Sequence, residues 1–325
     1  MPPPVVSVEE LSVTFPMDGG VHCAVSGVSL AVLENEIFGI VGESGSGKSV
    51  TCLALAGLLP PKALLSGRVT LHGRSYPASA LRKVDRHALP PIGIVFQEPP
   101  ACLNPVRTIG SQLVETAIAS GMDREQAVAE SLRLLERVGI ANARERMNAY
   151  AGEFSGGMCQ RVMIAMALAM QPRLIIADEP TTALDVTVQA QVVALLAEVV
   201  RERGIPMIFV SHDLDLIAET CDRVAVMYSG TVVEVGKTDI LYNAPSHPYT
   251  RLLLDAMPGR TAPRQRLADI PGEIRAMPGP PMACTFAERC PRVQPECRSA
   301  LPPLAWADGR SLACMNPWRE HADAV

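Results

Sequence analysis

The feature that most constrains this chain is a glycine-rich octapeptide, GESGSGKS, at residues 42–49. It fits the P-loop pattern GxxxxGK(S/T) at every fixed position, and it lies between an apolar run, EIFGIVG, and a helix-forming run, KSVTCLALAGLL. The glycines allow the backbone to turn tightly with its N–H groups facing an anion, and the N-terminus of the next helix adds a favourable dipole. The motif therefore predicts a strand, a phosphate-binding loop and a helix in succession.

The residue types in this loop match the needs of a nucleotide site. A lysine at position 48 can offset the charge of β- and γ-phosphates, and the hydroxyl of Ser49 can bind Mg²⁺. A glycine-rich turn that binds nothing is the simpler alternative, but the strand, loop and helix in register disfavour it. The loop residues expected to bind ATP are Gly42, Ser44, Gly45, Ser46, Gly47, Lys48, Ser49 and Val50.

Short apolar runs separated by helical segments predict an α/β fold. The runs at 92–96, 174–177 and 207–210 follow an N-terminal strand at 5–15, and alternation of strands with helices favours a parallel sheet covered by helices. Between 109 and 170 the pattern is helical without an obvious strand. We interpret this stretch as a helical subdomain, at about 98–170, inserted in the α/β core.

Polar residues follow three of the predicted strands. Asp178 and Glu179 end the run LIIADE, Gln97 follows IGIVF, and His212 follows MIFV after one serine. In open α/β sheets, ligands bind at the carboxyl ends of the strands, so these side chains can reach the nucleotide. Asp178 would contact Mg²⁺ and Glu179 would orient the attacking water.

Composition narrows the class of protein. The net charge of −5 and the lack of a Lys/Arg block argue against a nucleic-acid partner. The stretch MPPPVVSVEE has no basic region followed by an apolar run, and nowhere do about 18 apolar residues occur together, so we expect a soluble, cytoplasmic chain in which cysteines stay reduced. After Tyr249 the sequence turns rich in Pro and Gly, which predicts a linker into a small C-terminal module.

That module contains four of the nine cysteines, namely Cys284, Cys290, Cys297 and Cys314. A reducing compartment disfavours disulfides between them. Zinc sites bring ligands in pairs two to four residues apart, and the intervals here are wider. An iron–sulfur cluster is larger and tolerates wider spacing in an irregular segment. The spacing leaves zinc and iron–sulfur both open.

The segment FSGGMCQR at 154–161 identifies a family. Together with the P-loop, Gln97, the carboxylate pair, ALD at 183–185 and SHD at 211–213, it resembles the ATP-binding cassette (ABC) ATPases over about residues 5–245. The resemblance implies a P-loop core with an N-terminal antiparallel β subdomain, an inserted helical subdomain and a small irregular C-terminal module. It also implies that two subunits enclose two ATP molecules, each P-loop facing the SGG of the other subunit.

The resemblance carries roles onto matching residues. Phe15 would stack on adenine, Gln97 would join Ser49 and Asp178 at Mg²⁺, and His212 would contact the γ-phosphate beside Glu179. The signature residues Ser155, Gly156 and Gly157 would act on the ATP of the partner, and Asp185 would belong to the D-loop. The signature departs from common patterns at Phe154, Met158 and Cys159.

Finer features resemble the ATPase subunits of bacterial dipeptide and oligopeptide importers. These are FQEPPACLNPVRTIG around Gln97, DEPTTALDVTVQAQ, and NAPSHPYTRLLLDAMPG, where a C-terminal extension at 246–325 opens. The resemblance implies a peripheral ATPase on the cytoplasmic face of the inner membrane, working with a second ABC ATPase expected to be a paralogue, two membrane permeases and a solute-binding protein. Import of nickel or another metal chelate is the alternative within this branch. Some members of the branch carry a 4Fe-4S cluster on four such cysteines, so the resemblance favours that cluster over zinc.

Three rival functions remain beside this reading. A DNA-associated cassette ATPase would carry sustained heptads between Lys48 and Ser155, and this interval lacks them. A translation-associated cassette protein would carry two P-loops, whereas the sequence has one. A redox-sensing module built on the terminal cysteines would make ATP turnover depend on oxidation.

Overall fold

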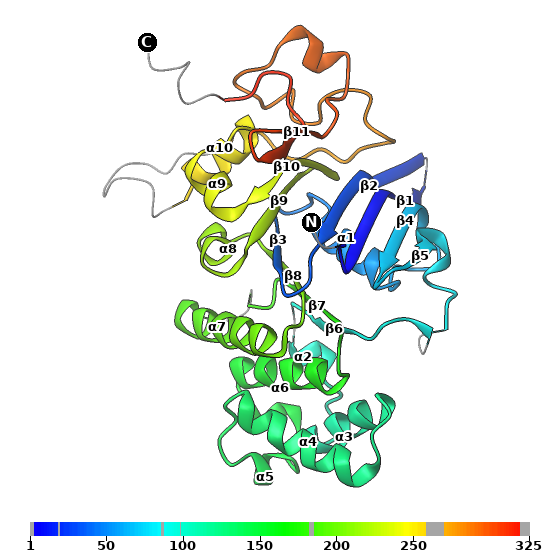
Figure 1. Ribbon diagram of the computed structural model, residues 1–325, viewed down its shortest axis with the longest axis vertical. Helices are drawn as coiled ribbons and strands as arrows, with labels where there is room; N and C mark the ends of the chain where they lie inside the picture. Colours follow the sequence, from blue (N-terminus) through cyan, green and yellow to red (C-terminus); the bar gives the residue numbers. More distant parts are fainter. Residues whose placement is uncertain are drawn as a thin grey trace.

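Two β-sheets organise the computed structural model (Figure 1), which describes residues 3–18, 20–85, 88–97, 99–181, 185–257 and 270–318. The four-stranded antiparallel sheet has the order β2-β1-β4-β5 and consists of β1 (Val6–Met17), β2 (Gly20–Val32), β4 (Leu64–Leu71) and β5 (Arg74–Pro77). This sheet is the N-terminal antiparallel subdomain that the family resemblance implied.

The second sheet has eight strands in the order β11-β12-β10-β9-β3-β8-β7-β6. Its strands are β3 (Ile37–Val41), β6 (Ile92–Val95), β7 (Leu174–Asp178), β8 (Met207–Ser211), β9 (Arg223–Tyr228), β10 (Thr231–Lys237), β11 (Ala305–Ala307) and β12 (Arg310–Leu312). The five central strands from β9 to β6 are parallel. The carboxyl ends of β3, β8, β7 and β6 therefore meet at one edge, where the predicted site residues follow.

Two hydrophobic cores cover the faces of the larger sheet. One lies between that sheet, helix α1 (Lys48–Leu55) and the antiparallel sheet, because alternate residues of β3 such as Phe38 and Ile40 pack with Leu55 and Val8. The other lies beneath the remaining helices and takes the opposite residues of β3, Ile37 and Val41. A strand buried on both faces is apolar at every position, which is why EIFGIVG shows no alternation.

Helices between β6 and β7 form a separate layer, at the bottom of Figure 1, distant from the antiparallel sheet. They are α2 (Pro99–Cys102), α3 (Ile109–Ala119), α4 (Arg124–Arg137), α5 (Ala143–Arg146) and α6 (Gly156–Ala169). Asp123 begins α4 with a capping box, in which its carboxylate accepts from the Gln126 N–H at 2.9 Å. The helical layer predicted for this region is confirmed.

The remaining helices surround the C-terminal half of the sheet. They are α7 (Val186–Arg203), α8 (Leu214–Thr220), α9 (Thr238–Asn243) and α10 (Pro248–Asp255). We expected an irregular linker after Tyr249, and helix α10 there is a correction. His247 caps this helix by accepting from the Tyr249 N–H at 3.0 Å, and Pro248 occupies its first turn, where proline is well tolerated.

Residues 270–318 form an irregular layer above the sheet edge, drawn orange to red in Figure 1. The short hairpin β11–β12 joins the edge strand β10 in antiparallel register, with Glu234 opposite Leu312 and Gly236 opposite Arg310. No local pattern in this segment predicted the addition to the sheet. No helix among the described residues is long and apolar enough to span a membrane.

Candidate nucleotide site

The P-loop connects β3 to α1, and close backbone contacts require glycine at both of its ends. Gly47 has φ +100°, and a Cβ there would lie 2.7 Å from the Ala24 carbonyl oxygen. A Cβ at Gly42 would lie 2.2 Å from the Met227 carbonyl oxygen. The loop backbone thus packs closely between β2 and β9, and this packing fixes the position of the loop at the sheet edge.

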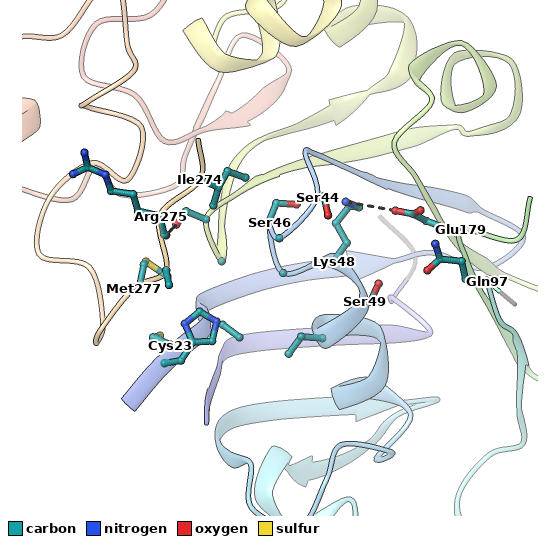
Figure 2. A pocket seen from close by; sticks show the side chains of 18 residues that line it. Cys23, Ser44, Ser46, Lys48, Ser49, Gln97, Glu179, Ile274, Arg275 and Met277 are labelled. Carbon is teal, nitrogen blue, oxygen red and sulfur yellow. Dashed lines mark hydrogen bonds and ion pairs between the residues drawn. The ribbon is translucent and has the colours of Figure 1, made fainter. Parts of the chain in front are cut away.

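Lys48 is buried at the centre of the loop. Its Nζ donates to the carbonyl oxygens of Gly42 at 2.9 Å and Glu43 at 3.0 Å, and it lies 3.8 Å from Glu179 Oε1. Burial lowers the pKa of Lys48, whereas the nearby carboxylates of Glu179 and Asp178 oppose that shift. The ammonium is held where phosphate oxygens can approach it (Figure 2).

Asp178 and Ser49 form a pair of oxygen ligands suited to Mg²⁺. The Ser49 hydroxyl donates to Asp178 Oδ1 at 2.9 Å, and burial raises the pKa of Asp178. Gln97, after β6, lines the cavity at the P-loop together with Ser49 and adds an amide oxygen. Hydroxyl, carboxylate and amide oxygens are the donors that this hard cation takes, so the residues fit the metal.

Glu179 follows β7 in an unusual backbone conformation, with φ +45°. Its N–H donates to the Val210 carbonyl oxygen at 3.0 Å, which ties it to β8. Its carboxylate lies between two cationic or proton-donating groups, with Oε2 3.2 Å from His212 Nδ1 and Oε1 facing Lys48. A residue other than glycine in the left-handed conformation is strained, and such strained residues are found preferentially at functional sites.

A cavity of about 440 Å³ lies against the P-loop, whose residues form part of its lining (Figure 2). Its lining residues are His22, Cys23, Ala24, Ser44, Gly45, Ser46, Gly47, Lys48, Ser49, Val50, Gln97, Glu179, Ser229, Gly230, Ile274, Arg275, Ala276 and Met277. Ser46 Oγ is buried here without a hydrogen-bond partner among the described residues, so a ligand oxygen could satisfy it.

Residues 25–182 match the ABC transporter family. The chain is also 43% identical over 317 residues to the oligopeptide transport ATP-binding protein OppD of Salmonella typhimurium, covering 97% of this chain and 95% of that protein. The chain belongs to the ABC transporter family. The motif-based prediction of an ABC ATPase is therefore confirmed.

Further comparisons agree with this assignment. The ABC ATPase is 39% identical over 316 residues to the dipeptide transport ATP-binding protein DppD of Escherichia coli, covering 96% of this chain and 97% of that protein. Residues 233–297 match the C-terminal region of oligopeptide/dipeptide transporters. The solved dimer of the ATP-binding cassette MJ0796 with ADP and Pi has a TM-score of 0.62 at 28% identity, covering 72% of this chain and 98% of that one.

The signature of this ABC ATPase begins helix α6, away from its own P-loop cavity. Ser155 is the N-cap and accepts from the Met158 N–H at 3.4 Å. Gly157 packs so closely on α7 that a Cβ there would lie 2.7 Å from Val188 Cγ1. None of residues 155–157 is among the described residues that line the cavity. The buried Cys159 packs behind the signature, with its Sγ 3.6 Å from the Ala151 carbonyl oxygen.

Asp185, the predicted D-loop residue, is the N-cap of α7. Its side chain accepts from the Val188 N–H at 3.0 Å. Ala183 and Leu184, the other residues of the ALD motif, lie outside the described residues. Asp185 is exposed and starts the helix that the signature glycine touches, so the two motifs adjoin on one surface.

The adenine-stacking role of Phe15 stays a prediction. Phe15 is partly buried against the core of the antiparallel sheet and does not line the cavity. Its cross-strand neighbour His22 does, and His22 Nδ1 is buried without a partner among the described residues. Sequence reasoning missed His22, because strand pairing rather than any motif brings it to the site.

The C-terminal segment 274–277 supplies a second group of lining residues that sequence reasoning missed. In Figure 2 it lies on the opposite side of the P-loop from Glu179 and Gln97. The Cys23 N–H donates to the Met277 carbonyl oxygen at 2.9 Å, and the Ser229 hydroxyl donates to that of Arg275 at 3.4 Å. These are backbone acceptors in a Pro/Gly-rich stretch, so no side-chain pattern could have revealed them.

The four C-terminal cysteines lie near one another. Cys314 has its pKa raised to about 12 by burial, and Cys284, Cys290 and Cys297 are close enough to add to the shift. Backbone N–H groups donate to the sulfur atoms of Cys284, Cys290 and Cys314. Among the described residues, no group of three or more His, Cys, Asp or Glu side chains could hold a metal ion.

Proposed function

We propose that this ABC ATPase powers the import of oligopeptides or dipeptides through membrane permeases. The observation that carries the proposal is the pairing, in one chain, of the cassette with an extension matching the C-terminal region of oligopeptide/dipeptide transporters. Relatives that span nearly the whole chain are transport ATP-binding proteins for those cargoes. We divide the chain at 245, with the nucleotide-binding domain at 1–245 and the extension at 246–325.

The site supports hydrolysis of the γ-phosphate bond by water. Lys48 would attract the β- and γ-phosphates, while Ser49, Asp178 and Gln97 would hold the Mg²⁺ that accompanies ATP. Glu179 orients and polarises the attacking water, because its carboxylate lies at the strand end beside Lys48. His212, 3.2 Å from Glu179, orients that carboxylate and can donate to the γ-phosphate.

A second ABC ATPase, a paralogue, would complete each site. The signature residues lie outside their own cavity and next to Asp185 on an exposed surface, which supports their acting on the ATP of a partner. Two permeases and a solute-binding protein would complete the importer. The ATPase would then lie peripherally at the cytoplasmic face of the inner membrane.

The four cysteines are proposed to hold a 4Fe-4S cluster. Cys284, Cys290 and Cys297 all contribute to the raised pKa of Cys314, so the four thiols lie near one another. Backbone N–H groups directed at sulfur are among the features that tune such clusters. Bound there, the cluster would cross-link an irregular segment that has little core of its own.

Metal analysis of anaerobically purified protein tests the cluster. We expect about four irons per chain and absorption near roughly 400 nm. Cys290→Ser should lose most of the iron, whereas Cys102→Ser, at an exposed position on α2, should retain it. Stoichiometric zinc without iron would exclude the cluster and leave the ATPase assignment intact.

Uptake by intact cells tests the cargo. Cells carrying Lys48→Ala in place of the parent chain should lose uptake of radiolabelled tripeptide to the level of a deletion strain. The control Lys62→Ala, at an exposed position, should retain it. Peptide uptake that persists while uptake of radioactive nickel disappears would assign the cargo to a metal chelate and overturn peptide import.

A further inference from the structure

Two residues of the C-terminal extension, Tyr249 and Arg289, form hydrogen bonds with one residue of the P-loop, Glu43. The Glu43 N–H donates to the Tyr249 hydroxyl at 2.9 Å. Arg289 donates to both carboxylate oxygens, from Nη1 to Oε2 at 2.7 Å and from Nη2 to Oε1 at 3.0 Å. Two residues more than 200 positions away thus hold the backbone and the side chain of the same loop residue.

Several further contacts hold the Arg289 side chain in this position. Its Nε donates to the Pro271 carbonyl oxygen at 2.7 Å, and its Nη2 donates to that of Ile270 at 3.0 Å. The guanidinium also lies over the Tyr228 ring, 5.6 Å from the centroid, and its side chain is only 7% exposed. A planar bidentate pair with this much burial and support is far more ordered than a surface ion pair.

Glu43 is next to the groups that bind phosphate. Its carbonyl oxygen accepts from Lys48 Nζ at 3.0 Å, and its carboxylate is one of the charges that act on Lys48. Without Arg289, a bare carboxylate in the loop would repel phosphates and compete for the Lys48 ammonium. Pairing with Arg289 removes that competition and fixes the first turn of the loop.

We propose that Arg289 and Tyr249 are positioning residues for nucleotide binding, through which the C-terminal extension neutralises and orients Glu43 in the P-loop. Arg289 directly precedes Cys290, and the Cys284 N–H donates to the Cys297 carbonyl oxygen at 3.0 Å, so the fold of the four-cysteine module sets where Arg289 lies. The inference rests on the ATP site assigned to the P-loop and is independent of the cargo.

Titration of the full-length chain with a fluorescent ATP analogue and Mg²⁺ tests this role. Arg289→Gln should weaken nucleotide affinity about tenfold, the scale of one charge-assisted hydrogen-bonded pair. Adding Glu43→Gln should bring the affinity back to within about threefold of the parent, because the uncompensated carboxylate is then gone. Turnover at saturating ATP should change by less than about threefold, since no group at the reacting atoms is altered.

Companion variants separate positioning from a merely structural role. Arg289→Lys keeps the charge but lacks the planar guanidinium that donates to both carboxylate oxygens, so it should give an intermediate nucleotide affinity. Arg298→Gln, at an exposed position of the same module, should leave nucleotide affinity unchanged. If Arg289→Gln fails to fold, Tyr249→Phe tests the second contact and should weaken affinity about threefold. Affinity within about twofold of the parent in folded Arg289→Gln, or no recovery in the double variant, would overturn the proposal. Loss of binding in Lys48→Ala separately tests the ATP site itself.

Discussion

At the scale of single residues, Glu179 combines a strained backbone with two neighbours that can stabilise its charge. Its φ of +45° is maintained by the N–H bond to β8, which makes the position of the carboxylate a product of the sheet rather than of a flexible loop. Lys48 and His212 then face opposite oxygens of that carboxylate. This arrangement leads to a prediction about its replacement.

Glu179→Gln should reduce turnover about 100-fold or more while MgATP affinity stays within about threefold of the parent. The amide keeps the shape of the side chain but cannot polarise water as a carboxylate does. Steady-state hydrolysis and nucleotide titration on the same preparation measure the two quantities. Turnover within about threefold of the parent would show that Glu179 is not the catalytic group.

His247 predicts a pH dependence of stability. Burial lowers the pKa of His247 to about 3, from 6.5 in an unfolded chain, so the folded state keeps it neutral. As pH falls from about 6.5 toward 3, the unfolded chain binds a proton that the folded chain does not. The free energy of unfolding should therefore fall over this window by at most about 1.4 kcal/mol per pH unit, and level off below it.

Chemical unfolding at a series of pH values measures that slope. His247→Asn keeps an N-cap acceptor for α10 but removes the titrating ring, so its slope between pH 6.5 and 3 should be shallower than that of the parent. Equal slopes in the two proteins would contradict a buried neutral His247.

At the scale of elements, a buried ion pair attaches the β11–β12 hairpin to the edge of the main sheet. Glu234 on β10 is fully buried and accepts from Arg310 on β12 at 3.0 Å. The same carboxylate accepts from the N–H groups of Ser246 and His247 at 3.0 Å, ahead of helix α10. Arg310 also donates to the Ala244 carbonyl oxygen. One carboxylate thus joins a strand, a hairpin and a helix start.

Arg310→Met should lower the free energy of unfolding by about 3 kcal/mol or more, because it leaves a buried charge without its cation. Adding Glu234→Gln should recover part of the loss, since the amide still accepts from the backbone and carries no charge. Urea unfolding of the parent, single and double variants measures the effect. A loss below about 1 kcal/mol in Arg310→Met would show that water compensates the carboxylate and that the hairpin is weakly attached.

At the scale of the whole molecule, the signature and the P-loop belong to different layers. The P-loop lies at the edge of the main sheet, whereas residues 155–157 begin the helical layer and do not line the nucleotide cavity. In the proposed arrangement of two subunits, each chain would contribute one half to each of two nucleotide sites. Hydrolysis at full rate should require a partner that supplies the other half.

Ser155→Asp should leave the MgATP affinity of the isolated chain within about twofold of the parent, yet abolish stimulated turnover in the assembled transporter. Aspartate keeps the N-cap of α6 but places a negative charge opposite the phosphates of the partner's ATP. Ser155→Asn, which caps equally well without the charge, is the matched control and should retain more activity. Stimulated turnover that survives Ser155→Asp would rule out a signature that faces nucleotide.

The sequence by itself determined the parts of this protein whose physics is local. The P-loop spacing, the apolar strands ending in polar residues and the helical stretch each depend on neighbours within a few residues, and each is found where it was predicted. Strand-end residues such as Gln97 and Glu179 could also be grouped in advance, because parallel strands bring their carboxyl ends together.

Only the tertiary structure decided which distant segments meet. His22 reaches the nucleotide cavity through strand pairing, segment 274–277 reaches it through backbone hydrogen bonds, and Arg289 reaches Glu43 across 246 positions. The extension lacks periodicity, so its path is set by bonds to the core, such as the pairing of β12 with β10, rather than by its own propensities. Such contacts depend on the folded shape of two remote surfaces, and no local pattern encodes that shape.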